Sequence, residues 1–181
     1  MLANLLTTLR LVIAIPVALA FALPGSLDPK LHLTLIVMAI ASDFADGKVA
    51  RHYGTASNRG MLFDHATDFL FVSSALAGLA YNGNIEALLP ILIIIAFSQY
   101  VLDSYLLFKQ KHLRMSLLGR WNGILYFLPI VLFANAALPM YPESFQQILS
   151  SLATASVLVL SISTMASIVD RTLAPKKRSN A

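Results

Sequence analysis

Four aspartates lie close together in a chain that is otherwise poor in charge. Asp43, Asp46, Asp64 and Asp68 fall within the stretch SDFADGKVARHYGTASNRGMLFDHATD, although the 181-residue sequence has only nine acidic residues. On helices, Asp43 and Asp46 are one turn apart, as are Asp64 and Asp68, so each pair occupies one helix face. Because the connection between the pairs is short, the two helices can return side by side, and we expect the four carboxylates to converge.

Carboxylates gathered in this way repel one another unless positive charge lies between them. Oxygen ligands in a chain without cysteine suit Mg²⁺, Mn²⁺ or Ca²⁺. Two such ions roughly 4 Å apart form a clamp for in-line displacement at phosphorus. Gly47 and Gly60 leave space beside the carboxylates for a ligand or a neighbouring helix, and the Arg51 guanidinium could hold a diphosphate through paired hydrogen bonds. The cluster therefore indicates metal-dependent phosphate chemistry.

The elements that must position these aspartates are predicted to be membrane-spanning helices. Hydrophobic residues make up 57% of the chain and charged residues 12%, with a mean hydropathy of +0.73, which is too apolar for an ordinary soluble domain. Backbone groups in lipid must pair within their own segment, so each apolar stretch of about 20 residues is expected to be a helix. We predict an all-α integral membrane fold with six transmembrane helices around a polar cavity that faces the cytoplasm, in a single domain over residues 1–181. The expected spans are Leu5–Leu23, Leu31–Ala50, Met61–Tyr81, Ala87–Phe108, Leu117–Leu138 and Phe145–Ile168.

The distribution of lysine and arginine predicts the orientation in the membrane. Lys30 is the only basic residue in the expected outer loops, whereas the opposite side and the tail are rich in basic residues. By the positive-inside tendency, both termini are expected in the cytoplasm. The net charge of +4 favours membrane lipids with anionic headgroups, or phosphates, as partners. Nucleic acid is not expected, because the chain has no basic helix and no aromatic RNA-binding platform.

The spacing of the aspartates resembles the signature of the CDP-alcohol phosphotransferase family. The chain reads Asp43-x₂-Asp46-Gly47-x₂-Ala50-Arg51-x₈-Gly60-x₃-Asp64-x₃-Asp68, with every fixed identity of that signature present. Near the N-terminus, the segment NLLTTLR is similar to the family's Asn-x-x-Thr segment. The short length and the six expected spans agree as well, so the resemblance covers most of the chain.

This resemblance implies a role for each matching residue. Asp43, Asp46 and Asp64 would bind a first divalent ion, and Asp43, Asp64 and Asp68 a second, with Mg²⁺ or Mn²⁺ as the metal. Asp68 would also be the general base that accepts the proton of the acceptor hydroxyl. The donor's cytidine and diphosphate would be held by residues of the N-terminal segment and the signature: Asn4, Thr7, Gly47, Arg51 and Ser57.

The implied reaction is attack of an alcohol on the lipid-side phosphorus of a CDP-linked donor, with CDP-diacylglycerol as the expected donor and CMP as the leaving group. Bound metals would neutralise the diphosphate and the charge that develops on the leaving CMP oxygen. The family resemblance also implies a homodimer.

The acceptor is indicated by the segment KQKHLRMSLLGRWNG. Its basic residues either hold an acceptor phosphate or only fix the topology: Lys109, Lys111, Arg114 and Arg120. SLLGRWNG is somewhat similar to a Gly-Lys segment of phosphatidylglycerophosphate and cardiolipin synthases, which favours glycerol 3-phosphate or a glycerol-bearing lipid.

The chain also departs from those synthases. His65 and Phe69 stand where phosphatidylglycerophosphate synthases usually carry proline and lysine. Asp103, expected near the cytoplasmic end of the fourth span, either pairs with Arg114 or Arg120 or selects the acceptor headgroup.

Plainer interpretations stay open at this point. The alternative is that the aspartates belong to a small membrane cation transporter, or to an inactive structural homologue that binds metal without turnover. Asn4 and Thr7 could simply cap the first helix, and Ser57 could be a turn residue. His65 is expected to pack beside the metal ligands without binding metal itself.

Overall fold

The computed structural model describes the backbone of residues 2–52, 58–102 and 117–179, and the side chains of 7–45, 62–102 and 118–173. All regular structure in these ranges is helical, which confirms the predicted all-α class. In chain order the described helices are α1 (Leu2–Ala22), α2 (Pro29–His52), α3 (Asn58–Tyr81), α4 (Leu88–Leu102), α5 (Leu117–Leu125), α6 (Phe127–Ala136) and α7 (Glu143–Ser179).

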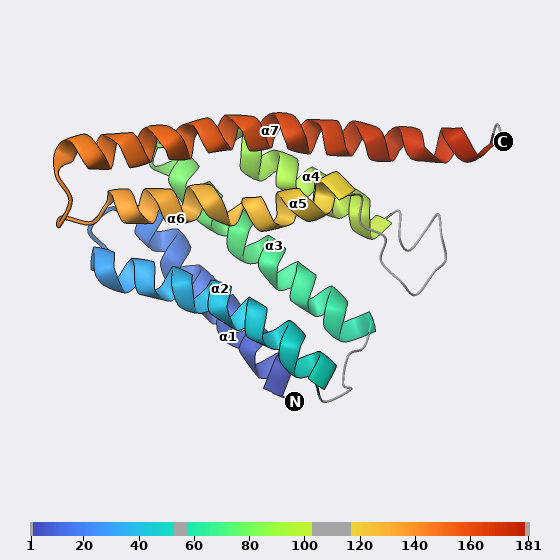
Figure 1. The fold of residues 1–181 in the computed structure, drawn as a ribbon, viewed down its shortest axis with the longest axis horizontal. Coiled ribbons are helices and arrows are strands. Elements are labelled where there is room, and N and C mark those ends of the chain that lie inside the picture. The colour runs from blue at the N-terminus through green and yellow to red at the C-terminus, as the bar shows by residue number, and fades with distance from the viewer. Residues whose placement is uncertain (1, 53–57, 103–116, 180–181) are drawn as a thin grey trace.

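The helices run back and forth along the molecule (Figure 1). Helix α1 packs against α2 and α3, while α7 packs against α4, α5 and α6, and α3 contacts α4 between the two groups. The connections α1–α2, α3–α4 and α6–α7 lie toward one end. The opposite end of the molecule holds the start of α1 and the ends of α2, α4 and α7. The aspartates lie in the C-terminal half of α2 and the N-terminal half of α3, so they share this end.

Capping interactions fix two of the helix ends at the opposite end. The Asp28 carboxylate accepts hydrogen bonds from the backbone N–H groups of Lys30 (2.9 Å) and Leu31 (3.1 Å), which satisfies free amides at the start of α2. Helix α3 ends at Tyr81 and is closed two residues later by Gly83, whose φ of 78° is in the left-handed region. The Asn84 N–H donates to Leu79 O and the Gly83 N–H to Ala80 O, both at 3.0 Å, which is the Schellman arrangement.

The predicted span Leu117–Leu138 is divided into α5 and α6, which follow each other in line (Figure 1). Pro129 accounts for the break, because it has no N–H to donate to the carbonyl of Leu125 and its ring crowds that carbonyl. Tyr126 lies at the turn and its hydroxyl is 2.7 Å from the Thr164 hydroxyl on α7. The interruption therefore coincides with a polar contact to the neighbouring helix.

Helices α1 and α3 approach each other closely at Gly78. A Cβ at this position would collide with the backbone carbonyl of Ala18 and lie 3.1 Å from the Cβ of Phe21. Small residues at such crossings let helix backbones pack tightly. The crossing lies beside fully buried core residues, including Val17, Phe71 and Leu76.

We predict that Gly78→Val destabilises the protein by about 1–3 kcal/mol, the usual cost of overpacking, because the colliding atom belongs to backbone and cannot move aside. The thermal unfolding midpoint in detergent measures this effect. Gly123→Ala on α5 is the matched control, since a Cβ there has nothing within 4 Å. An unchanged midpoint for Gly78→Val would show that the close approach is not required.

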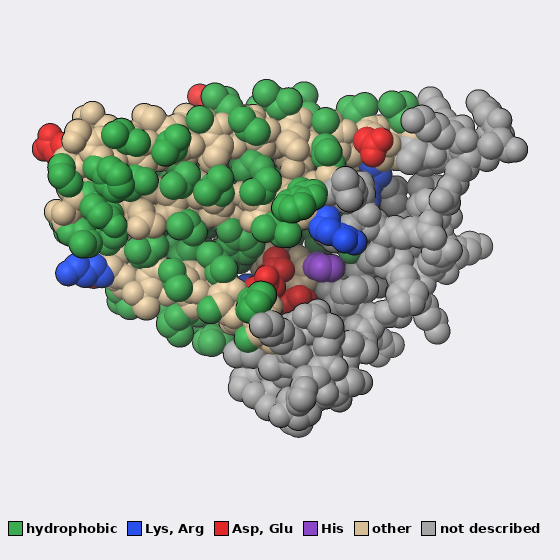
Figure 2. All heavy atoms as spheres, in the orientation of Figure 1, with side chains coloured by type: hydrophobic (Ala, Val, Ile, Leu, Met, Phe, Trp, Pro, Cys, Tyr) green, Lys and Arg blue, Asp and Glu red, His purple; other side chains and the backbone are tan. Residues whose placement is uncertain are grey.

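Of the described helices, α7 has the length and composition for a membrane span, over Glu143–Leu173 with a mean hydropathy of 2.0. Thr7–Ala22 and Leu88–Leu102 are apolar but shorter. Helices α2 and α3 carry the aspartates, which lowers their hydropathy. Exposed hydrophobic side chains are spread over the described part of the face seen in Figure 2, a surface typical of proteins that contact lipid or a partner.

Candidate active site

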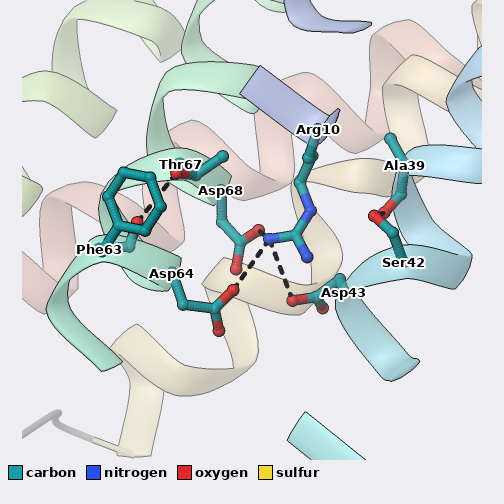
Figure 3. A network of polar contacts seen from close by, with 8 residues as sticks. All are labelled: Arg10, Ala39, Ser42, Asp43, Phe63, Asp64, Thr67 and Asp68. Atoms are coloured by element: carbon teal, nitrogen blue, oxygen red, sulfur yellow. Dashed lines mark hydrogen bonds and ion pairs between the residues drawn. The ribbon is translucent and has the colours of Figure 1, made fainter. Parts of the chain in front are cut away.

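Three of the four predicted aspartates converge on one buried arginine (Figure 3). Asp43 comes from α2, Asp64 and Asp68 come from α3, and Arg10 reaches them from α1. The Arg10 Nη1 atom lies 3.4 Å from Asp43 Oδ1 and 3.1 Å from Asp64 Oδ1, and it also donates a hydrogen bond to Asp68 Oδ1. Negative charge therefore remains in excess around a single guanidinium.

The exposure of these groups differs sharply. The Arg10 side chain is 0% exposed, whereas the side chains of Asp43, Asp64 and Asp68 are 39%, 27% and 25% exposed. A fully buried charge is costly unless it is paired, so the carboxylates compensate Arg10. The three carboxylate side chains stay partly exposed, which leaves them able to bind a further ligand.

Two hydroxyl groups near the cluster bond to the backbone of their own helices. Thr67 Oγ1 donates to the carbonyl of Phe63 at 2.9 Å, and Ser42 Oγ donates to the carbonyl of Ala39 at 2.8 Å (Figure 3). Such bonds back to the same helix satisfy a hydroxyl in an apolar setting. The two side chains beside the cluster are thus engaged within their own helices.

The carboxylates border a cavity of about 410 Å³. One part of its wall is apolar and includes Phe69, Val72, Ile93 and Phe97, with the rings of Phe69 and Phe97 stacked at a centroid distance of 4.2 Å. Figure 2 shows acidic, histidine and basic side chains gathered in one hollow of a largely hydrophobic face. A cavity with both an apolar and a charged wall suits an amphipathic ligand.

Further polar residues that line the cavity come from α4, α5 and α7. Arg120 and Arg171 line the cavity from α5 and α7, and the Arg171 guanidinium lies 5.2 Å from the Tyr100 ring centroid. Gln99 donates to the carbonyl of Ile168 at 3.3 Å, which joins α4 to α7 beside this arginine. Two cationic groups therefore line the same cavity as the carboxylates.

The acidic cluster has the chemistry of a divalent-metal site. Asp64, His65 and Asp68 offer ligand atoms that lie within 4.8 Å of one another, and Asp43 reaches the same Arg10 nitrogen as Asp64 and Asp68. Carboxylate oxygens are the preferred ligands of Mg²⁺ and Mn²⁺. The residues present thus fit such an ion. The His65 ring lies 6.3 Å from that of Tyr100, on the cavity side.

The structure brings together some of the predicted site residues. Asp43, Asp64 and Asp68 converge as expected, Thr7 is buried on α1 one turn before Arg10, and Arg120 lines the cavity. Other predicted residues lie in helices whose side chains are outside the described residues: Asn4, Asp46, Gly47 and Arg51. The rest lie wholly outside the described ranges: Ser57, Asp103, Lys109, Lys111 and Arg114.

Sequence reasoning missed the central position of Arg10 and treated it, like Arg171, only as part of the charge distribution. A signal was available for Arg10, because a single arginine within an apolar segment usually faces a polar interior. No comparable signal marks Gln99 and Tyr100, which join the cavity only because α4 packs against α7.

Comparison with known proteins assigns the chain to the same family that the aspartate motif indicates. Residues 1–168 match the sequence profile of the CDP-alcohol phosphatidyltransferases. The chain belongs to this membrane-associated family, which confirms the resemblance drawn from the motif.

Among curated relatives, the chain is similar to CDP-diacylglycerol–glycerol-3-phosphate 3-phosphatidyltransferases of two bacterial genera. It is 29% identical to the Mycoplasma genitalium protein over 149 residues, 71% of this chain and 62% of that protein. It is 35% identical to the Rickettsia felis protein over 93 residues, 51% of each. The Rickettsia typhi protein matches equally, also at 35% over 93 residues. The matched region thus spans between half and two thirds of these relatives' length.

Proposed function

We propose that the protein transfers the phosphatidyl group of CDP-diacylglycerol to glycerol 3-phosphate and releases CMP. One observation carries the proposal: Asp43, Asp64 and Asp68 of the family motif converge at a cavity that has both an apolar and a cationic wall. The relatives named above carry this activity in their names, which supports the choice of donor and acceptor.

The aspartates are proposed to hold two divalent ions, Mg²⁺ or Mn²⁺. Asp43, Asp46 and Asp64 form the first ligand set, and Asp43, Asp64 and Asp68 the second. When bound, these ions supply positive charge that neutralises the diphosphate and the leaving phosphate oxygen. The accessible carboxylate oxygens support this role, because the side chains of Asp43, Asp64 and Asp68 are all partly exposed.

The donor is proposed to lie across the motif with its lipid part against the apolar wall. Asn4, Thr7, Gly47, Arg51 and Ser57 would hold the cytidine and diphosphate. The stacked Phe69 and Phe97 rings would contact the diacylglycerol portion. In this position Phe69 supplies apolar surface, which accounts for an aromatic residue directly after Asp68.

Asp68 is proposed to act as the general base. It accepts the proton of the glycerol 3-phosphate hydroxyl as that oxygen forms a bond to the lipid-side phosphorus. The bond between this phosphorus and the bridging diphosphate oxygen breaks at the same centre, and CMP leaves with the electron pair. Asp68 is the least exposed of the three described aspartates and borders the cavity, which supports its position next to the acceptor.

The acceptor phosphate is proposed to bind between Arg120 and Arg171, with Lys109, Lys111 and Arg114 as further candidates. Both arginines line the cavity, and a guanidinium can hold phosphate oxygens in a bidentate manner. The Tyr100 ring beside Arg171 would restrain that guanidinium. Because the arginines and the carboxylates line the same cavity, an acceptor whose phosphate binds the arginines could place its hydroxyl end at the carboxylates.

We propose that six membrane spans, with α5 and α6 together forming the fifth, place the cavity toward the cytoplasm and both termini inside. The homodimer remains a prediction from the family. Because the chain has no cysteine, single substitutions can report the orientation. A membrane-impermeant maleimide added to intact cells should label Ser26→Cys between α1 and α2 and should label Ser179→Cys only after lysis. The reverse pattern would contradict the proposed orientation.

The reaction is tested by identifying the product. Purified protein in lipid, supplied with CDP-diacylglycerol, Mg²⁺ and glycerol 3-phosphate labelled with ¹⁸O in its hydroxyl groups, should form a phosphatidylglycerol phosphate that retains the label at the new ester. Phosphatidylglycerol, serine, inositol phosphate and choline serve as competing acceptors. Product from one of these alone would keep the reaction class but correct the acceptor. No lipid product with any acceptor would reject the proposal.

A further inference from the structure

Arg10 is a buried cation that the proposed reaction leaves without a role. Its side chain is fully buried, and one nitrogen, Nη1, contacts carboxylate oxygens of Asp43, Asp64 and Asp68. These aspartates belong to two helices and are up to 25 positions apart in the sequence, so the contacts tie α2 and α3 to α1 at a single point (Figure 3). A lone structural ion pair would need only one of the three.

The three aspartates around Arg10 are the same three that form the proposed second metal ligand set. We infer that the Arg10 guanidinium takes the place of the second metal ion when that ion is not bound, and that it then holds Asp43, Asp64 and Asp68 together. A divalent ion that binds these aspartates must displace the guanidinium from at least one carboxylate. The first ligand set includes Asp46 and lacks Asp68, so it competes less with Arg10. This inference rests on the metal-binding part of the proposed function.

Two physical consequences follow from this arrangement. First, three carboxylates that converge from two helices would repel one another in the metal-free protein, and the guanidinium offsets that repulsion. Second, an incoming ion meets a positive charge already at the carboxylates, so the second ion binds more weakly than the first. Arg10 thus opposes the second ion and stabilises the state that lacks it.

The test compares wild type with Arg10→Gln and Arg10→Lys, each purified in Mn²⁺ and then divided between EDTA and Mn²⁺. Titration calorimetry gives the Mn²⁺ affinities and thermal unfolding gives the midpoints, both without CDP-diacylglycerol. Tyr126→Phe is the control, because it removes a buried hydroxyl contact to Thr164 and leaves the charges around the carboxylates unchanged. It should lower the midpoint equally in EDTA and in Mn²⁺.

For Arg10→Gln we expect the second Mn²⁺ to bind tighter than in wild type by on the order of ten- to a hundredfold, since a buried cation beside the ion is removed. Its unfolding midpoint should fall in EDTA and return close to the wild-type value in Mn²⁺. Arg10→Lys keeps the charge, so its second-ion affinity should stay within a few fold of wild type.

Several results would overturn the inference. A second-ion affinity that is unchanged or weaker in Arg10→Gln would show that Arg10 does not compete with the ion. Equal behaviour of the Gln and Lys variants would show that charge is not the cause. Failure of Arg10→Gln to fold even in saturating Mn²⁺ would show that an ion cannot replace the guanidinium.

These measurements separate the inference from the proposed function. If wild-type protein binds two Mn²⁺ ions but forms no lipid product, the proposed reaction is rejected. The Mn²⁺ affinities of wild type and the Arg10 variants would then still test the inference. Wild-type protein that forms product while Arg10→Gln shows no change in Mn²⁺ affinity would reject the inference alone. Wild-type protein that binds no Mn²⁺ would reject both.

Discussion

Asp68→Asn should lower the rate of CMP release by on the order of 10³–10⁴-fold, near the upper end of the effect of removing a general base. The amide cannot accept the hydroxyl proton, and it is also a poor ligand for a divalent ion. Asp68 borders the cavity and contacts Arg10 with the other two carboxylates, so the substitution acts directly where the new bond is proposed to form. Initial rates with saturating CDP-diacylglycerol and glycerol 3-phosphate measure the loss.

Asp28→Asn provides the matched control for this variant. Asp28 caps α2 at the end of that helix away from the aspartate cluster, and asparagine caps helices about as well as aspartate. Its CMP release should equal that of wild type. If Asp68→Asn kept more than about a tenth of wild-type activity, Asp68 would not be the general base, since even the weakest such bases contribute about a hundredfold.

Arg171→Gln should raise the KM for glycerol 3-phosphate by about ten- to a hundredfold, the usual worth of a charge-assisted hydrogen bond. The kcat should change much less, because the phosphate lies away from the reacting hydroxyl. Arg120→Gln should act in the same direction with a smaller effect, since Arg120 is exposed whereas Arg171 is half-buried against Tyr100. Initial rates across a range of glycerol 3-phosphate concentrations separate the two constants.

A comparison of acceptors makes this second prediction specific to phosphate binding. Glycerol lacks the phosphate, so any residual transfer to glycerol should be nearly equal in wild type and Arg171→Gln. Lys30→Gln removes a lysine at the opposite end of the molecule and should leave the KM unchanged. An unchanged KM for glycerol 3-phosphate in both arginine variants would place the acceptor phosphate elsewhere.

The convergence of the aspartates was predictable because it depends on short-range geometry. Among the described residues, α2 and α3 both pack against α1 and not side by side. Spacings of three and four residues nevertheless place each pair on one helix face, and the short connection was expected to bring the two pairs together. The contacts of Asp43, Asp64 and Asp68 with one nitrogen confirm this expectation for three of the four residues. The role of Asp46 stays a prediction, since its side chain lies outside the described residues.

The partner of these aspartates was not predictable in the same way. Arg10 is more than 30 positions before Asp43, and its contact depends on how α1 packs against both α2 and α3. That packing is set in part by Gly78, where the α3 backbone approaches the carbonyl of Ala18. No local sequence pattern encodes such a tertiary crossing.

The break in the fifth predicted span could be predicted from the sequence, whereas the polar wall of the cavity could not. Pro129 lies within the predicted span Leu117–Leu138, so the break between α5 and α6 has a local cause that the sequence displays. The polar wall has no local cause, because Gln99, Tyr100 and Arg171 meet only through the packing of α4 on α7. Sequence therefore predicted the metal-binding side of the site better than the acceptor side.

The most direct test of the proposed activity is CMP release by the purified protein in lipid, measured with CDP-diacylglycerol and glycerol 3-phosphate in Mg²⁺ and again after the metal is removed with EDTA. We predict release that requires both glycerol 3-phosphate and the metal and that returns when Mg²⁺ or Mn²⁺ is restored. Release that continues in EDTA, or no release under any of these conditions, would contradict the assignment of Asp43, Asp46, Asp64 and Asp68 to metal-dependent phosphatidyl transfer.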